Sequence, residues 1–120
     1  MVREGVRRIF LVVSLVVVPM LVAGCNRRVA GGSTDGAKVF AEACARCHGP
    51  GGKPPVQMVD SLGVRDLTAD EFRDRRNRAL IENQVRHGSG NGRMPAFAGA
   101  LSEPQITAVA AYVMALGAAR

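Results

Sequence analysis

The sequence lacks the patterns that mark a β-sheet, a repeat protein or a nucleic-acid-binding surface. No segment alternates apolar and polar residues with a period of two, and no segment recurs along the chain, so neither a sheet nor a repeat architecture is expected. Aromatic residues are scarce, with no tryptophan and one tyrosine in 120 residues, and no basic run is interleaved with them. Nucleic-acid binding is therefore not expected either.

The sequence also lacks an apolar run long enough for a stable transmembrane helix, which needs roughly 20 residues. The one candidate, residues 9–23, is shorter and contains Ser14 and Pro19. It follows a segment with three arginines and ends in small residues. This order is typical of a cleavable export signal, which we predict over residues 1–24.

The end of this signal resembles the lipobox of bacterial lipoproteins, in which a cysteine is diacylated and becomes the mature N-terminus. Residues 21–25 read Leu-Val-Ala-Gly-Cys. The resemblance implies a lipidated Cys25 and a domain held at the periplasmic face of a bacterial membrane, because two or three acyl chains anchor stably. The alternative is an ordinary signal peptide with an incidental cysteine.

Residues 25–33 are predicted to form a flexible tether, because they are polar and contain glycine. Such a segment spans under about 20 Å. The remaining residues, 34–120, are expected to form one small domain. Without the signal the chain has 13 basic and 9 acidic side chains, a net charge of +4 against +6 for the whole sequence, and this balance indicates no particular partner.

The domain is expected to be all-helical. Helices are predicted from Thr34 or Asp35 to Ala45, from a capping box at residues 68–71, from Asn77 to His87, and from the capping box that Ser102 opens. Apolar residues recur at spacings of three and four in three of these segments: Val39, Phe40, Ala43 and Cys44; Leu80, Ile81 and Val85; Ile106, Val109, Ala110 and Val113.

The strongest motif is Cys44-Ala45-Arg46-Cys47-His48, the Cys-x-x-Cys-His pattern of covalent haem attachment. Residues three apart on a helical turn share a face, so both thiols can reach the two vinyl groups of one porphyrin with the imidazole beneath the iron. A thioredoxin-like redox pair would need a βαβ setting, and a zinc site would need more ligands than His87 alone supplies. We therefore expect one covalent haem c.

With this motif, residues 34–116 resemble a small class I cytochrome c. Gly36 and Phe40 stand eight and four residues before Cys44, as in that family's first helix, and Val109 and Tyr112 resemble the pair on the last helix. The resemblance implies a cytochrome c fold of three to five helices. The first and last helices would cross nearly at right angles, with the glycine allowing their close approach.

Arg93-Met94-Pro95 resembles the family's loop that supplies the second axial ligand, so Met94 is expected to bind the iron opposite His48. Its rivals are Met58, Met114 and His87. The ordinary alternative for Met114 is a core residue. For His87 it is a surface residue at the end of a helix.

The sequence leaves two kinds of haem contact unassigned: the partner of the proximal histidine and the partners of the propionates. In family members a proline carbonyl accepts the Nδ1 proton of the proximal histidine, and Pro54 or Pro55 could supply it here. Basic side chains could pair with the propionates, and the candidates are Lys53, Arg65, Arg75 and Arg76.

An iron closed axially by His48 and Met94 has no open position for a substrate, so no enzyme and no small-molecule substrate are expected. The expected function is single-electron transfer between respiratory-type redox protein partners from a tethered position. Two alternatives remain: a fixed cytochrome subunit of a larger membrane oxidoreductase, and a ligand-binding sensor or peroxidase in which Met94 dissociates.

Overall fold

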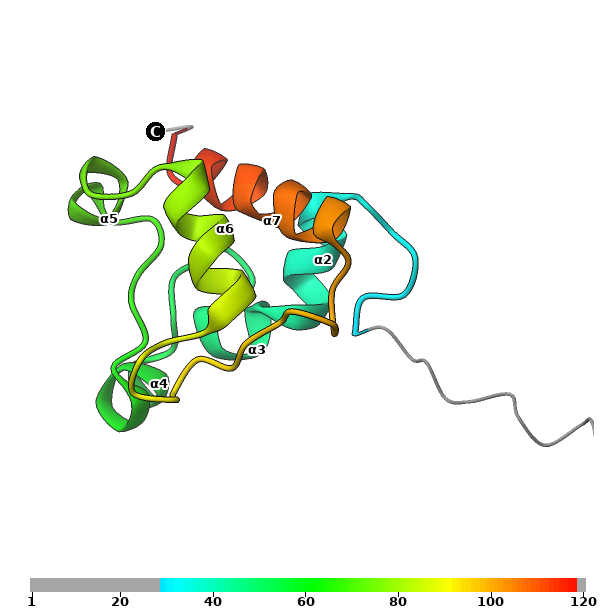
Figure 1. Ribbon diagram of the computed structural model, residues 1–120. Helices are drawn as coiled ribbons and strands as arrows, with labels where there is room; N and C mark the ends of the chain where they lie inside the picture. The colour runs from blue at the N-terminus through cyan, green and yellow to red at the C-terminus, as the bar shows by residue number, and fades with distance from the viewer. Residues whose placement is uncertain (1–28, 119–120) are drawn as a thin grey trace, which may run out of the picture.

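The computed structural model describes residues 29–118 and folds them into six helices around one core (Figure 1). The helices are α2 (Gly36–Ala43), α3 (Ala45–His48), α4 (Val56–Leu62), α5 (Asp70–Asp74), α6 (Arg78–His87) and α7 (Glu103–Ala115). This part of the chain contains no strand, and a single isolated bridge joins Ala98 and Leu101. The prediction of an all-helical domain is confirmed.

The described residues form six helices rather than the expected three to five, for two local reasons. The first predicted helix divides at Cys44, which ends α2 and precedes the short α3. The second reason is α4, which begins after Pro55 and ends at Gly63. It has only seven residues and none is buried, so the helical spacing of Val56, Val59 and Leu62 directly after two prolines is too short a signal to predict it.

Side-chain caps start three of the helices largely where the sequence predicts them. The Asp35 carboxylate accepts a hydrogen bond from the Ala37 amide at 3.0 Å, and Asn77 accepts one from the Leu80 amide at 2.9 Å. At α7, the Ser102 amide donates to the Gln105 side-chain oxygen at 2.9 Å. Each bond satisfies a polar group that helix geometry leaves without a partner.

The capping box predicted at residues 68–71 is wrong, although a short helix does begin there. α5 starts at Asp70 behind Ala69, with no side-chain cap. The amide and hydroxyl of Thr68 donate instead to one oxygen of Asp66, at 2.8 and 2.6 Å. A short turn around Asp66 replaces the cap, a competition that aspartate and threonine side chains commonly win.

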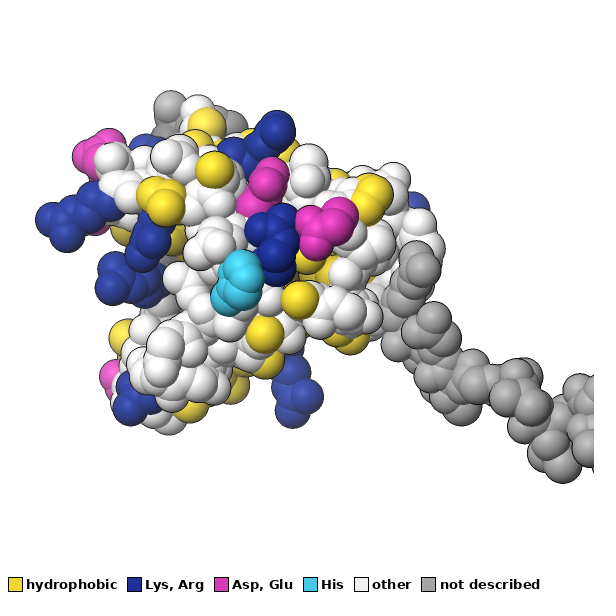
Figure 2. All heavy atoms as spheres, viewed as in Figure 1, with side chains coloured by type: hydrophobic (Ala, Val, Ile, Leu, Met, Phe, Trp, Pro, Cys, Tyr) yellow, Lys and Arg dark blue, Asp and Glu magenta, His cyan; other side chains and the backbone are white. Residues whose placement is uncertain are grey.

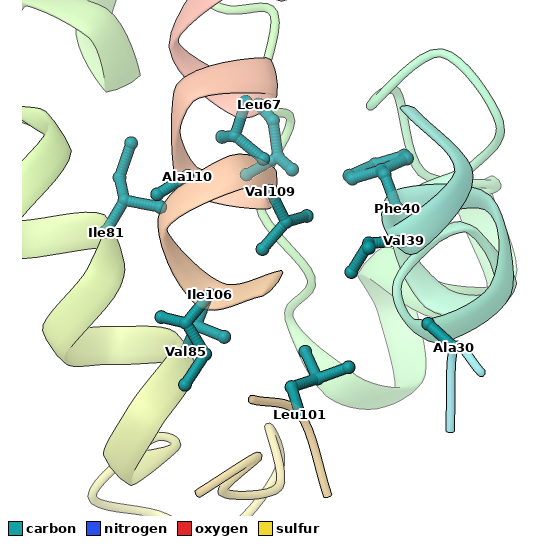
Figure 3. Close-up of a cluster of buried hydrophobic side chains, with 11 residues drawn as sticks. Ala30, Val39, Phe40, Leu67, Ile81, Val85, Leu101, Ile106, Val109 and Ala110 are labelled. Atoms are coloured by element: carbon teal, nitrogen blue, oxygen red, sulfur yellow. The ribbon is translucent and has the colours of Figure 1, made fainter. Parts of the chain in front are cut away.

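The core forms where α2 and α6 pack on α7, as Figure 3 shows. Val39 and Phe40 of α2 lie on one side of Val109, and Ile81 and Val85 of α6 lie on the other side of α7. The Phe40 and Tyr112 rings also meet, with centroids 5.3 Å apart and planes tilted by 51°. α7 is therefore the central element, and its stripe of apolar residues predicted from the sequence is buried.

The crossing of α2 and α7 depends on the absence of a side chain at Gly36. A Cβ at this position would lie 2.3 Å from the carbonyl oxygen of Ala108 and 2.9 Å from the Cβ of Tyr112. Both distances are far below van der Waals contact, so the two helices approach as closely as backbone atoms allow.

Residues 25–28 of the predicted tether lie outside the described residues, but residues 29–33 are packed on the domain. Ala30 is buried in the core, and the Val29 amide donates to the Ala100 carbonyl at 3.3 Å. Residues 29–33 therefore form a docked segment. The predicted signal over residues 1–24 and Cys25 lie outside the described residues, and no helix within residues 29–118 is both long and apolar enough to cross a membrane.

Candidate cofactor site

A cavity of about 430 Å³ opens between α6, α7 and the segments around α3, α4 and the loop that follows α6. Apolar side chains make up much of its wall, including Phe40, Val109 and Val113 from the core. Cys44, Cys47, His48 and Met94 all line it. The structure thus brings into one space the four predicted ligand residues, which the sequence spreads over 51 positions.

Cys44, Cys47 and His48 occupy one tight turn at the junction of α2 and α3. The amides of Cys47 and His48 both donate to the Cys44 carbonyl, at 3.1 and 3.0 Å. The turn therefore holds the three side chains on neighbouring positions of one cavity wall. This arrangement suits two thioether bonds to a single macrocycle with the imidazole beside them.

The chemistry of the two thiols does not match a thiolate site. Both cysteines are free and half-buried. Burial, with a smaller contribution from nearby Cys47, raises the pKa of the Cys44 thiol to about 11. Reactive and zinc-binding cysteines require the opposite shift, and no group of three or more Cys, His, Asp or Glu within residues 29–118 could hold a metal ion.

His48 is half-buried, in a setting that favours a neutral imidazole. Burial lowers its pKa below the ordinary value, and the backbone of Arg65 partly offsets this. Its Nδ1 atom is buried and has no hydrogen-bond partner. The carbonyls of Pro54 and Pro55, the candidates from the sequence, therefore do not accept its proton here. A neutral ring is the form that coordinates iron.

Met94 is held on the cavity wall by the loop between α6 and α7. The Met94 amide donates to the Ser89 hydroxyl at 2.9 Å, and the Ser89 amide donates back to the Met94 carbonyl at 3.0 Å. Gly88 has a φ of +73°, and a Cβ there would lie 2.6 Å from the Met94 carbonyl oxygen. The glycine-rich loop therefore permits a close return of the chain, and Ser89 fixes it; no local pattern marks this serine in the sequence.

The rivals of Met94 lie elsewhere. His87 is exposed, and its Nδ1 atom lies 3.0 Å from the Asn83 carbonyl on its own helix. Met58 belongs to α4, and Met114 packs against the core. None of these three residues lines the cavity.

The structure also separates the candidate partners of the propionates. Arg65 and Arg76 line the cavity, whereas Arg75 borders only a smaller surface pocket beside α5, and Lys53 borders neither. Arg93 is a cavity residue that the sequence analysis missed. Its position directly before Met94 is the signal that could have identified it.

These residues fit haem c. The donor set consists of two thiols, one half-buried imidazole and one thioether around a largely apolar cavity, with guanidinium groups among the residues that line it. A haem is apolar over most of its area and carries two carboxylates. The apolar wall suits the ring, and the guanidinium groups suit the carboxylates.

Comparison with known proteins gives the same assignment. Residues 32–113 match the family described as cytochrome c oxidase, cbb3-type, subunit III. The chain is 37% identical to cytochrome c6 of Thermosynechococcus vestitus over 105 residues, covering 88% of each chain. It is 36% identical to cytochrome c6 of a Nostoc species over 108 residues, covering 90% of this chain and 92% of the relative.

Two further similarities extend this picture. The cbb3-type oxidase subunit CcoP of Rhodobacter capsulatus is 38% identical over 92 residues, which are 71% of this chain but 29% of that subunit. The solved structure of the KustC0563 c-type cytochrome superposes with a TM-score of 0.62 at 26% identity, covering 68% of this chain and 96% of that one. The fold, the cavity and these relatives agree, and the chain therefore belongs to the small monohaem class I c-type cytochromes, with one covalently bound haem c.

Proposed function

We propose that this cytochrome carries single electrons between redox proteins, with haem attached through Cys44 and Cys47 and ligated by His48 and Met94. The observation that supports this proposal is the convergence of all four side chains on one cavity. When bound, haem supplies a one-electron iron couple. The rest of the function would belong to the chain: His48 and Met94 would hold the iron and leave no binding position for a substrate, and the largely apolar wall would limit contact of the haem with water.

The two proposed axial residues have different roles. The Met94 thioether is soft and neutral, so it favours ferrous iron and raises the reduction potential relative to harder ligands. The bonds between Met94 and Ser89 fix the backbone from which this side chain projects. A ligand held in this way changes little between oxidation states, which suits rapid electron transfer.

Electron exchange also requires a surface through which partners approach the haem edge. Leu80 lines the cavity and is 45% exposed, so the cavity wall reaches the surface at this residue. A small apolar contact on a cavity that Arg65, Arg76 and Arg93 also line suits weak and short-lived docking, which allows fast turnover of partners.

Replacing Met94 by alanine is expected to abolish the weak red absorption band that ferric iron gives with methionine sulfur. The reduction potential should also fall substantially, because the stabilisation of ferrous iron is lost. Absorption spectra and redox titration of the holoprotein measure both effects. Met58→Ala and Met114→Ala serve as matched controls, since neither residue lines the cavity. Loss of the band in either control, with the band intact in Met94→Ala, would exclude Met94 as the ligand.

We also propose that residues 1–24 direct export and that Cys25 carries the lipid. The supporting observation is the sequence at 21–25, Leu-Val-Ala-Gly-Cys. The haem-binding domain would then work at the periplasmic face of a membrane, where a tether raises the frequency of encounters with membrane-bound partners.

Cys25→Ser is expected to lose the lipid and to accumulate as the longer precursor that keeps residues 1–24, with haem content unchanged. Maturation of the native chain should be sensitive to globomycin, and no globomycin-sensitive step should remain in the variant. Haem-stained gels measure haem content, and the size of the haem-stained band measures processing. A variant that stays in membranes and is processed as before would rule out lipidation at Cys25.

A fixed subunit of a larger oxidoreductase is the second candidate. The family match to subunit III of a cbb3-type oxidase and the similarity to CcoP favour it. The chain spans under a third of the CcoP length, whereas it spans most of the cytochromes c6. This difference favours the mobile carrier, and co-purification of a stoichiometric membrane partner would favour the subunit.

A further inference from the structure

Gln105 is a buried polar side chain whose hydrogen-bonding groups are all in use. It is 1% exposed, in the first turn of α7. Its Oε1 atom accepts from the amide and the hydroxyl of Ser102, at 2.9 and 3.2 Å. Its Nε2 atom donates to the carbonyls of Ala30, Gly31 and Ser33, at 3.3, 3.1 and 2.9 Å. One amide therefore caps α7 and holds a segment more than 70 positions away in the sequence.

This contact fixes the docked segment, residues 29–33, to the domain. Ala30 is 2% exposed and belongs to the core, and the Val29 amide bonds to the Ala100 carbonyl. Release of the segment would expose Ala30 and leave a buried amide without acceptors, and both changes are unfavourable. Nothing in the cytochrome site uses Gln105, because it does not line the cavity.

The hydrogen bonds of the Gln105 side chain to residues 30–33, here called the Gln105 latch, shorten the chain available between the domain and the lipid. The sequence predicts a tether of residues 25–33, but the docked segment takes up residues 29–33. Four peptide steps then separate Cys25 from Val29. An extended chain gains at most about 3.6 Å per residue, so this distance is at most about 15 Å. A connection this short holds one face of the domain close to whatever binds Cys25.

That face lies across the molecule from the elements that carry the cavity's arginines. In Figure 1 the docked segment leaves the domain beyond α2 and the start of α7, whereas α4 and α5 lie on the other side. Arg65 stands between α4 and α5, and Arg76 follows α5; both line the cavity. Figure 2 shows most of the visible lysine and arginine side chains on this same side.

We propose that the Gln105 latch orients the domain on the bilayer, with the surface around Val29 and Ala100 facing the lipid headgroups and the arginine-bearing side of the cavity facing away. This inference rests on the proposed lipidation of Cys25. The orientation leaves α4, α5 and the exposed Leu80 free for a redox partner. Val29, 46% exposed, is an apolar side chain on the surface next to the bilayer.

The test uses the lipidated, ferrous holoprotein in nanodiscs of phosphatidylethanolamine and phosphatidylglycerol that contain a gadolinium-chelating lipid. The relaxation enhancement of backbone amides by gadolinium reports their distance from the headgroups. Enhancement at Gly99 and Ala100 should exceed that at Ser61 and Asp74 several-fold. Equal enhancement at both ends, with the protein still bound to the nanodiscs, would overturn the orientation alone. Failure of the protein to bind nanodiscs would overturn the lipid anchor, and the orientation with it.

Two variants connect the orientation to the latch. Gln105→Ala should remove the difference in enhancement, whereas Gln57→Ala, the same truncation on exposed α4, should keep it. Insertion of a flexible Gly-Ser segment between residues 28 and 29 leaves the domain and the latch intact but lengthens the connection. It should also remove the difference, with an unchanged absorption spectrum. A difference that survives the insertion would show that the short connection does not orient the domain.

Discussion

A chain in which both Cys44 and Cys47 are replaced by alanine is expected to leave a maturation-competent host without covalent haem and largely unfolded. The two thiols are the only cysteines in the cavity wall, so no other residue can form the thioether bonds. The effect on folding follows from the size of the site. Without haem, a cavity of about 430 Å³ whose wall is largely apolar would be open to water, which exposes apolar surface that the haem otherwise covers.

The whole stability of a domain of about 90 residues is only roughly 4 to 13 kcal/mol, so loss of the haem contacts is expected to remove a large part of it. Haem-stained gels after acid-acetone extraction measure covalent attachment, and far-ultraviolet circular dichroism measures helix content. Cys25→Ser is the matched control, because it removes a thiol outside the cavity and should retain both haem and helices. A doubly substituted chain that keeps acid-resistant haem would contradict the site assignment.

Gly36→Ala is expected to destabilise the holoprotein by about 2 to 3 kcal/mol, the upper part of the range of roughly 1 to 3 kcal/mol for a tight core that must accept an extra group. The new Cβ would lie 2.3 Å from the Ala108 carbonyl oxygen, and a backbone atom cannot rotate away. α2 and α7 would have to separate, which weakens the packing of Phe40 against Tyr112. For a domain of 60 to 100 residues this loss corresponds to a fall in Tm of roughly 10 to 20 °C.

Thermal unfolding followed at 222 nm measures the effect of Gly36→Ala. Gly51→Ala is the control, because a Cβ there meets no heavy atom within 4 Å and its backbone does not have a positive φ. Its Tm should change little. Equal stability of the two variants would mean that α2 and α7 do not depend on the small residue at their crossing.

Much of the fold could be predicted because its signals are local. Asp35, Asn77 and Ser102 begin helices where a short polar side chain precedes a periodic apolar stripe, and the structure retains all three starts. α4 was not predicted, because its apolar spacing covers only seven residues directly after Pro54 and Pro55 and is not supported by burial in the core. The cap expected at Thr68 failed because a neighbouring aspartate competes for the same donors.

The candidate site likewise contains some residues that the sequence predicts and others that only the fold identifies. Cys44, Cys47 and His48 are recognised from spacing alone, because one turn of backbone sets their relative positions. Met94, Met58 and Met114 look alike as side chains, and only the fold shows that the first lines the cavity. The fold likewise shows that Arg93 lines the cavity together with Arg65 and Arg76.

The sequence by itself determined the attachment motif, the helical class and the three capped helices, because each depends on residues within a few positions of one another. The tertiary structure decided which methionine faces the cavity, which arginines line it, and that Gln105 holds residues 30–33. These contacts join segments up to 75 residues apart. Their partners are chosen by the packing of α2 and α6 on α7, and no local pattern encodes that choice.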